Sequence, residues 1–119
     1  MSNYSVTDFD LEQLVAVLGD PTSLSEPERE YFWFKYDGFP GRSVLLKVSK
    51  YDRRASVIID SEAGESLFAM ESVDLVRVLE PERRTLEIIS SEFKTRCFLA
   101  LHGDGPIEVS VGDLDDHGY

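Results

Sequence analysis

The chain has 119 residues, of which 42% are hydrophobic and 11% aromatic, and its 23 acidic and 12 basic side chains give a formal net charge of -11. This length is typical of one domain, and the apolar content is too high for a disordered chain. No apolar run approaches the roughly 18 residues of a membrane span, and the single cysteine, Cys97, excludes an internal disulfide.

We therefore expect one domain over residues 1–119, with frayed ends at 1–6 and 113–119. The first five residues carry neither the basic nor the apolar region of a secretory signal. The sequence on these grounds predicts a cytoplasmic protein.

The first predicted element is a helix that ends at Gly19. Its apolar positions have the i, i+3, i+4, i+7 spacing of one buried stripe: Leu11, Leu14, Val15 and Leu18. Thr7 or Asp8 can cap its start, Gly19 suits the position after its last turn, and Pro21 prevents its continuation. Residues 20–30 read as an exposed acidic connector.

From Tyr31 onward the apolar period changes to two, which indicates β-strands. The expected strands are 31–36, 43–50, 55–60, 75–79, 85–90, 96–101 and 107–111, and residues 66–70 could form a further short strand. Turn-rich segments separate them, with hairpin signals at 80–84 and 102–106. Residues 72–79 are ambiguous, because Ser72 could cap a helix, although their valine content and Pro81 favour a strand. The predicted fold class is α+β, with the N-terminal helix packed on a curved, mainly antiparallel β-sheet of about seven strands.

No group of residues suited to catalysis is evident. The soft metal ligands are Cys97, His102 and His117, which form no zinc-binding motif, and no cofactor is indicated. Cys97 alternates with Leu99 and Leu101, so we expect it in the core rather than as a nucleophile. The sequence predicts a protein without enzymatic activity.

Nucleic-acid binding has weak support. Arg83, Arg84, Lys94 and Arg96 could gather near one hairpin, but a net charge of -11 opposes the approach of phosphate. The simpler interpretation is that these bases pair with neighbouring acids. The same field repels anionic lipid, so we expect neither a nucleic acid nor a membrane as partner.

An aromatic strand at 31–36 has two different faces. Tyr31, Trp33 and Lys35 share one face, whereas Phe32, Phe34 and Tyr36 share the other. The favoured interpretation is that both faces are buried. The alternative is that Tyr31 and Trp33 are partly exposed beside carboxylates, as in the hot spots of protein interfaces.

Two acidic clusters are the candidate partner-binding residues. The first, between residues 60 and 74, contains no base: Asp60, Glu62, Glu65, Glu71 and Asp74. The second lies beside the aromatic strand: Glu26, Glu28 and Glu30, with Tyr31 and Trp33 as anchors. We predict that the first cluster binds a basic protein, with the second cluster as the alternative binding surface. The alternative is that both clusters only keep the domain soluble.

The chain resembles the small acidic immunity proteins that bacteria pair with the toxins of contact-dependent inhibition and other polymorphic toxin systems. The resemblance covers the whole chain, with its strong acidity and its β-rich runs Ser43–Val48 and Ala55–Asp60, and includes no signature motif. It implies that an acidic face occupies or covers the basic substrate groove of a cognate toxin, which could be a nuclease. No binding residue is carried over from the family.

The predicted function is therefore a non-catalytic acidic protein that binds and neutralises a basic protein partner. A nucleic-acid mimic that inhibits a defence enzyme would have the same charge. An acidic accessory or ligand-binding module would instead show a closed apolar pocket with convergent polar groups. The sequence leaves the oligomeric state open.

Overall fold

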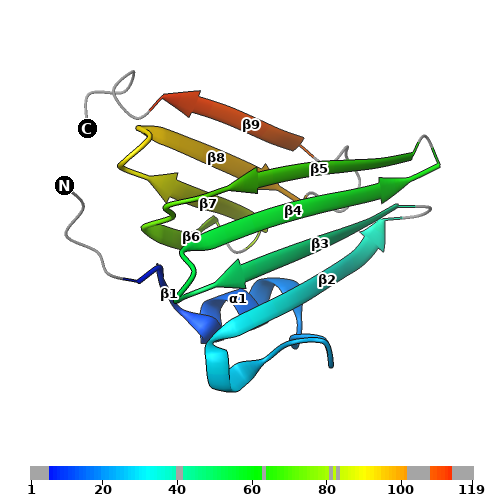
Figure 1. Ribbon diagram of the computed structural model, residues 1–119. Coiled ribbons are helices and arrows are strands. Elements are labelled where there is room, and N and C mark those ends of the chain that lie inside the picture. The colour runs from blue at the N-terminus through cyan, green and yellow to red at the C-terminus, as the bar shows by residue number, and fades with distance from the viewer. Residues whose placement is uncertain are drawn as a thin grey trace.

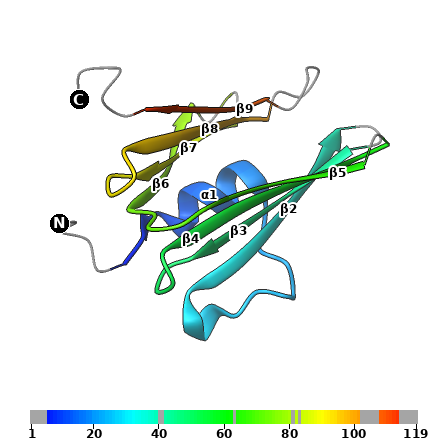
Figure 2. The ribbon, with the colours of Figure 1, turned by 45° about the horizontal axis from the view of Figure 1, so that its top comes forward.

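The chain folds into two β-sheets with one helix between them (Figures 1 and 2). The computed structural model describes residues 6–39, 42–62, 64–80, 82, 84–101 and 108–113. The four-stranded sheet contains, in spatial order, β2 (Tyr31–Phe39), β3 (Arg42–Ser49), β4 (Arg54–Ser61) and β5 (Gly64–Met70). The five-stranded sheet contains β1 (Asp8–Phe9), β6 (Leu75–Glu80), β7 (Thr85–Ser90), β8 (Thr95–Ala100) and β9 (Glu108–Asp113).

The α+β class and the mainly antiparallel pairing are confirmed, but the prediction of one curved sheet of about seven strands is wrong. Nine strands are present among the described residues, and they form two sheets. The chain crosses between the sheets after β5, where Ser72 adopts a positive φ of 53°. The ambiguous segment 72–79 contributes strand β6, and β1 pairs with it in parallel. Of the ends expected to be frayed, 1–6 and 113–119, residues 1–5 and 114–119 lie outside the described residues, whereas Asp113 is the last residue of β9.

The N-cap of helix α1 (Leu11–Leu18) lies three residues after Thr7 and two after Asp8, the two predicted caps. Asp10 is the N-cap, and its carboxylate accepts hydrogen bonds from the backbone N–H groups of Glu12 and Gln13. Gly19 ends the helix with a φ of 90°, as predicted. The connector that follows contains the short 3₁₀ helix η1 (Pro27–Arg29).

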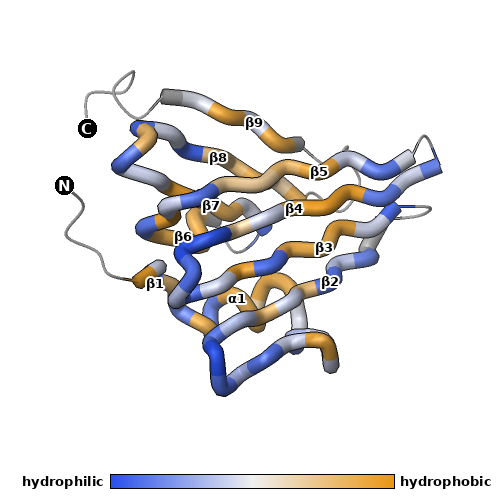
Figure 3. Tube along the Cα trace, in the orientation of Figure 1, coloured by the Kyte–Doolittle hydropathy of each residue, from blue (hydrophilic) through white to orange (hydrophobic). Residues whose placement is uncertain are grey.

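The core lies between the two sheets, and α1 closes one side of it by packing on β6 and β2 (Figure 2). Strand alternation places apolar side chains such as Val44, Leu46 and Val57 on the inner faces. Figure 3 shows continuous hydrophobic stretches in β3 and β4, because Leu45 and Ile58 on the outer face are apolar as well. The largest fully buried side chains of the strands include Phe34, Leu46, Leu86, Ile88 and Leu99. Cys97 is fully buried among them, which confirms its predicted place in the core.

A buried carboxylate stabilises the five-stranded sheet on the side that faces away from this core. Glu87 is 1% exposed and accepts a hydrogen bond of 2.8 Å from Nε of Arg77, its direct partner on β6. Its second oxygen lies 3.4 Å from Arg96, which is also buried and stacks on Phe98. One carboxylate thereby offsets two guanidinium charges.

Replacing Glu87→Gln should lower the free energy of unfolding by about 3 kcal/mol, because Arg96 would stay buried without this carboxylate. Urea unfolding followed by tryptophan fluorescence measures the loss. The control is Glu92→Gln, exposed in the turn after β7, and we expect a change of no more than about 0.5 kcal/mol from it. Equal losses for the two variants would contradict a special role of the buried carboxylate.

Candidate functional site

The candidate site is the outer face of the four-stranded sheet, the side turned away from the core. The register of β2–β5 aligns its side chains in four cross-strand rows. The rows are Glu65–Asp60–Ser43, Leu67–Ile58–Leu45–Lys35, Ala69–Ser56–Lys47–Trp33 and Arg54–Ser49–Tyr31, the last continued by Glu71 beyond β5. One row is thus apolar over three strands, and charged rows lie on both sides of it.

The outer face brings together five residues from the two clusters that are far apart in the sequence. Tyr31 and Trp33 come from β2, Asp60 from β4, Glu65 from β5, and Glu71 directly follows β5. Glu62 is exposed at the tip of the β4–β5 hairpin. Some members of each predicted cluster therefore lie on the same face of the sheet.

The aromatic part of the outer face is half-buried and fixed by contacts within the chain. Tyr31 and Trp33 meet edge to face, with ring centroids 5.9 Å apart. The ammonium of Lys47 lies 4.1 Å from the centroid of the Trp33 ring, in the position of a cation–π contact. The favoured interpretation that both faces of β2 are core does not hold, since Lys35 is exposed while Phe32 and Phe34 are buried.

A shallow hollow of about 410 Å³ lies on the outer face beside these aromatic residues. Its lining includes Tyr31, Lys47, Arg54, Ile58, Leu67 and Glu71. Leu67 is 67% exposed and lies in the same row as the apolar side chains of Ile58 and Leu45. A hollow that offers both apolar and charged groups can receive a side chain from another protein.

The carboxylates of the outer face differ in whether they form ion pairs within the chain. Glu71 pairs with Arg54 at 3.2 Å, and both side chains are exposed. Asp60, Glu62 and Glu65 form no ion pair with any described residue. These three carboxylates are therefore available to cations from outside.

Asp74, the last acid of the first predicted cluster, is not on this surface. It is 2% exposed, its carboxylate pairs with Arg53, and it accepts hydrogen bonds from the backbone N–H (2.7 Å) and hydroxyl of Ser91. Arg53 precedes β4 and Ser91 follows β7, so Asp74 ties the two sheets together. We call this arrangement the Asp74 joint.

The second cluster lies at the start of β2. Glu28 is exposed in η1, whereas Glu26 and Glu30 are half-buried. The backbone N–H of Glu26 donates to the carbonyl of Tyr31 at 2.8 Å, which folds the connector against the edge of β2. Glu26 and Tyr31 also line a hollow of about 290 Å³ together with Tyr51.

Sequence reasoning did not single out the apolar members of the outer face. The alternating pattern assigned Ile58 to the same face of its strand as Asp60. No feature of the sequence indicated that Leu67 is exposed. Both faces of β5 carry apolar residues, so the pattern alone does not show which side is solvent. No sequence motif identified Lys47 or Tyr51 as a candidate binding residue.

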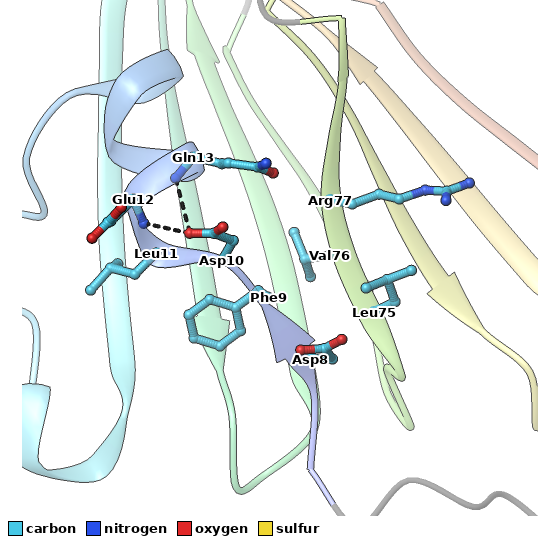
Figure 4. A pocket seen from close by; sticks show the side chains of 9 residues that line it. All are labelled: Asp8, Phe9, Asp10, Leu11, Glu12, Gln13, Leu75, Val76 and Arg77. Carbon is cyan, nitrogen blue, oxygen red and sulfur yellow. Dashed lines mark hydrogen bonds between the residues drawn. The ribbon is translucent and has the colours of Figure 1, made fainter.

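A larger hollow, of about 720 Å³, lies where β1 leads into α1 (Figure 4). Asp8, Asp10 and Glu12 border it, but Asp10 is already used as the helix cap. Figure 4 shows that Arg77 extends away from these acids. Its guanidinium group donates a hydrogen bond to Glu87 instead. Acids at the start of a helix offset the helix dipole, which accounts for this cluster without a ligand.

The described residues offer little for catalysis. Burial raises the pKa of the Cys97 thiol to about 11, so the sulfur stays protonated at neutral pH. No set of three or more His, Cys, Asp or Glu residues in the described part of the chain could hold a metal ion. His102 and His117 lie outside that part. Within it, α1 is far too short to cross a membrane.

The fold resembles a solved structure, although sequence comparisons found no relative. No protein-family model and no curated protein matches the chain. A chain in the contact-dependent growth inhibition toxin–immunity protein complex from Klebsiella pneumoniae 342 is similar, with a TM-score of 0.63 and 15% identity. The match covers 89% of this chain and 94% of that chain, so nearly the whole fold is shared.

Replacing Asp74→Asn should lower the free energy of unfolding by about 3 kcal/mol or more, because the variant breaks a buried ion pair. Glu71→Gln, in the same sequence cluster, should change it by no more than about 0.5 kcal/mol, because its ion pair is exposed. Thermal and urea unfolding of both variants measure the difference. Similar values for the two would contradict the structural role of Asp74.

Proposed function

We propose that the chain is an immunity protein that binds and neutralises a basic bacterial toxin, acting in the cytoplasm and without catalysis of its own. The observation that carries the proposal is the outer face of the four-stranded sheet. There, half-buried Tyr31 and Trp33 share one surface with carboxylates that have no partner among the described residues. Aromatic anchors within a charged rim are typical of binding hot spots.

The similarity to the Klebsiella complex supports this proposal at the level of the fold. That complex contains a toxin and an immunity protein. The likeness in fold by itself is therefore compatible with either role for this chain. The net charge of -11 favours the inhibitor. A nuclease toxin has to attract phosphate with Lys and Arg, whereas an acidic chain is drawn to that same basic surface.

The geometry gives less support to the other functions that share this charge. A ligand-binding module needs an enclosed apolar pocket, but the hollows found among the described residues open onto the surface and carry charged groups. A nucleic-acid mimic would need carboxylates spaced like phosphates. The outer face instead interrupts its acids with Leu67, Ile58 and Leu45.

Co-expression with the product of the adjacent reading frame tests the role directly. We expect that product to arrest bacterial growth and this chain to restore it. The double variant Glu62→Lys/Glu65→Lys should lose protection, since reversing contact charges costs on the order of 2–5 kcal/mol of binding. Glu92→Lys, exposed in the β7–β8 turn, is the matched control and should still protect. Growth arrest caused by this chain itself would refute the proposal.

Binding to that product should also depend on salt. The Debye length falls from about 30 Å at 0.01 M to about 8 Å at 0.15 M ionic strength, so long-range steering weakens. We expect the association rate to fall by about tenfold or more over this range, while the dissociation rate changes less. Stopped-flow or surface-based kinetics measure both rates. A constant association rate would mean that the acids serve solubility.

A further inference from the structure

The β5 strand is an open edge of the four-stranded sheet. It is the last strand in the order β2–β3–β4–β5, and all of its residues except Phe68 and Met70 are exposed. Backbone groups of residues 65–70 make no hydrogen bond to described residues beyond the ladder with β4. An exposed edge of this kind is a template for another strand.

The opposite edge of the same sheet is covered, which sets β5 apart. The carbonyl of Trp33 in β2 accepts a hydrogen bond of 2.8 Å from the backbone N–H of Thr22. The N–H of Trp33 donates to the hydroxyl of Ser25 at 2.9 Å. The connector thus satisfies the outer backbone groups at the start of β2, at Tyr31 and Trp33, from within the chain.

The register shows which groups of β5 point outward. Ser61 and Gly64 pair across a two-residue turn, and such a pair can form only by exchanging its own two hydrogen bonds. Because paired types alternate along the ladder, the pairs that include Glu65, Leu67 and Ala69 are non-hydrogen-bonded. The N–H and C=O groups of these three residues therefore point away from β4.

One side chain on the inner face of the five-stranded sheet is left exposed on its edge strand β9. Val76, Ile88, Cys97 and Val111 form one cross-strand row on its inner face. The first three are at most 1% exposed, whereas Val111 on β9 is 54% exposed. In Figure 1, β9 lies beyond the edge formed by β5. A strand added to β5 would face β9 and cover Val111.

The charges beside this edge indicate what the added strand carries. Asp60 and Glu65 lie directly opposite each other in a non-hydrogen-bonded pair, where Cα atoms are about 4.5 Å apart. Like charges in this arrangement repel. A Lys or Arg next to Glu65 would relieve the repulsion, and an apolar residue would pack on exposed Leu67 in the next row.

We propose that the basic partner contributes an extended segment that pairs with β5 and becomes the fifth strand of this sheet. On the outer face the segment places a Lys or Arg beside Glu65 and an apolar side chain beside Leu67. On the inner face it places apolar side chains over Val111. The inference rests on the proposed function and names where and how the partner binds.

A second copy of this chain fits the edge less well. Joining two copies at β5 about a two-fold axis would bring both β9 strands to the same side of the joined sheet, into the same space. It would also bring together two chains that each carry a net charge of -11. One strand from a basic partner meets neither obstacle.

The test uses the full chain, the purified product of the adjacent reading frame, and two variants at one position. Leu67→Pro removes the outward N–H and is tolerated at an edge facing solvent, whereas Leu67→Ala removes the side chain and keeps the N–H. We expect Leu67→Pro to weaken binding by about 100-fold and Leu67→Ala by about tenfold or less, since the proline also blocks pairing of the backbones. Circular dichroism and thermal unfolding verify that both variants fold.

Hydrogen exchange on the unmodified chain gives a second measurement that needs no variant. Binding should protect the amides of Glu65, Leu67 and Ala69, and leave those of Ser66, Phe68 and Met70 nearly unchanged, because the latter already bond to β4. Unchanged affinity of Leu67→Pro, or uniform exchange along β5, would overturn strand addition. If Glu62→Lys/Glu65→Lys still lost binding in that case, the proposed function would stand.

Two further outcomes are decisive. If the unmodified chain did not bind the adjacent product at all, the proposed function would fall and this inference with it. If sedimentation showed a dimer of this chain that Leu67→Pro abolished, the edge would belong to a second copy and the assigned occupant would be wrong.

Discussion

The buried carboxylate of Asp74 is the interaction on which the arrangement of the two sheets depends. This carboxylate forms an ion pair with Arg53, in the turn before β4, and accepts a hydrogen bond from Ser91, in the turn after β7. The backbone carbonyl of Asp74 accepts a hydrogen bond from the N–H of Asp8. Thr7 adds a hydrogen bond from its hydroxyl to Val73 at 2.8 Å. Removing a carboxylate from water is costly, and the cost is offset only because cation and donors are all in place. The joint therefore favours one placement of the sheets over looser ones.

Because the two sheets are held in one position relative to each other, the outer face of the four-stranded sheet is a rigid surface. Its side chains stand on strands rather than on loops, and Trp33 is held by Tyr31 and Lys47. Binding to a surface that is already ordered costs less conformational entropy than ordering a loop. The apolar row of Leu67, Ile58 and Leu45 would supply affinity, and the carboxylates beside it would supply speed and selectivity.

The sequence was sufficient for what depends on local periodicity and insufficient for what depends on contacts between distant segments. The period of the apolar residues and the positions of the turn residues predicted α1, its end at Gly19, strands β2 to β9 and the burial of Cys97, but not β1. They could not divide the strands between two sheets, because alternation marks the faces of a strand but not its neighbours. Asp74 was grouped with Glu71 because the two are close in the sequence. The crossing at Ser72 separates them, so that one is solvated and the other is in the joint.

The repulsion between Asp60 and Glu65 bears on which chain can use the β5 edge. Many exposed edges are guarded by lysine, which discourages pairing with any strand. Here the edge carries a pair of acidic residues and no lysine, so the repulsion discriminates between incoming strands by their charge. It opposes acidic strands, including those of another copy of this chain, and it is relieved by a basic one. Specificity is a difference between affinities, and a locally unfavourable pair can produce it by penalising the wrong partners more than the right one. The same two carboxylates thus lower the stability of the free chain slightly and increase its discrimination.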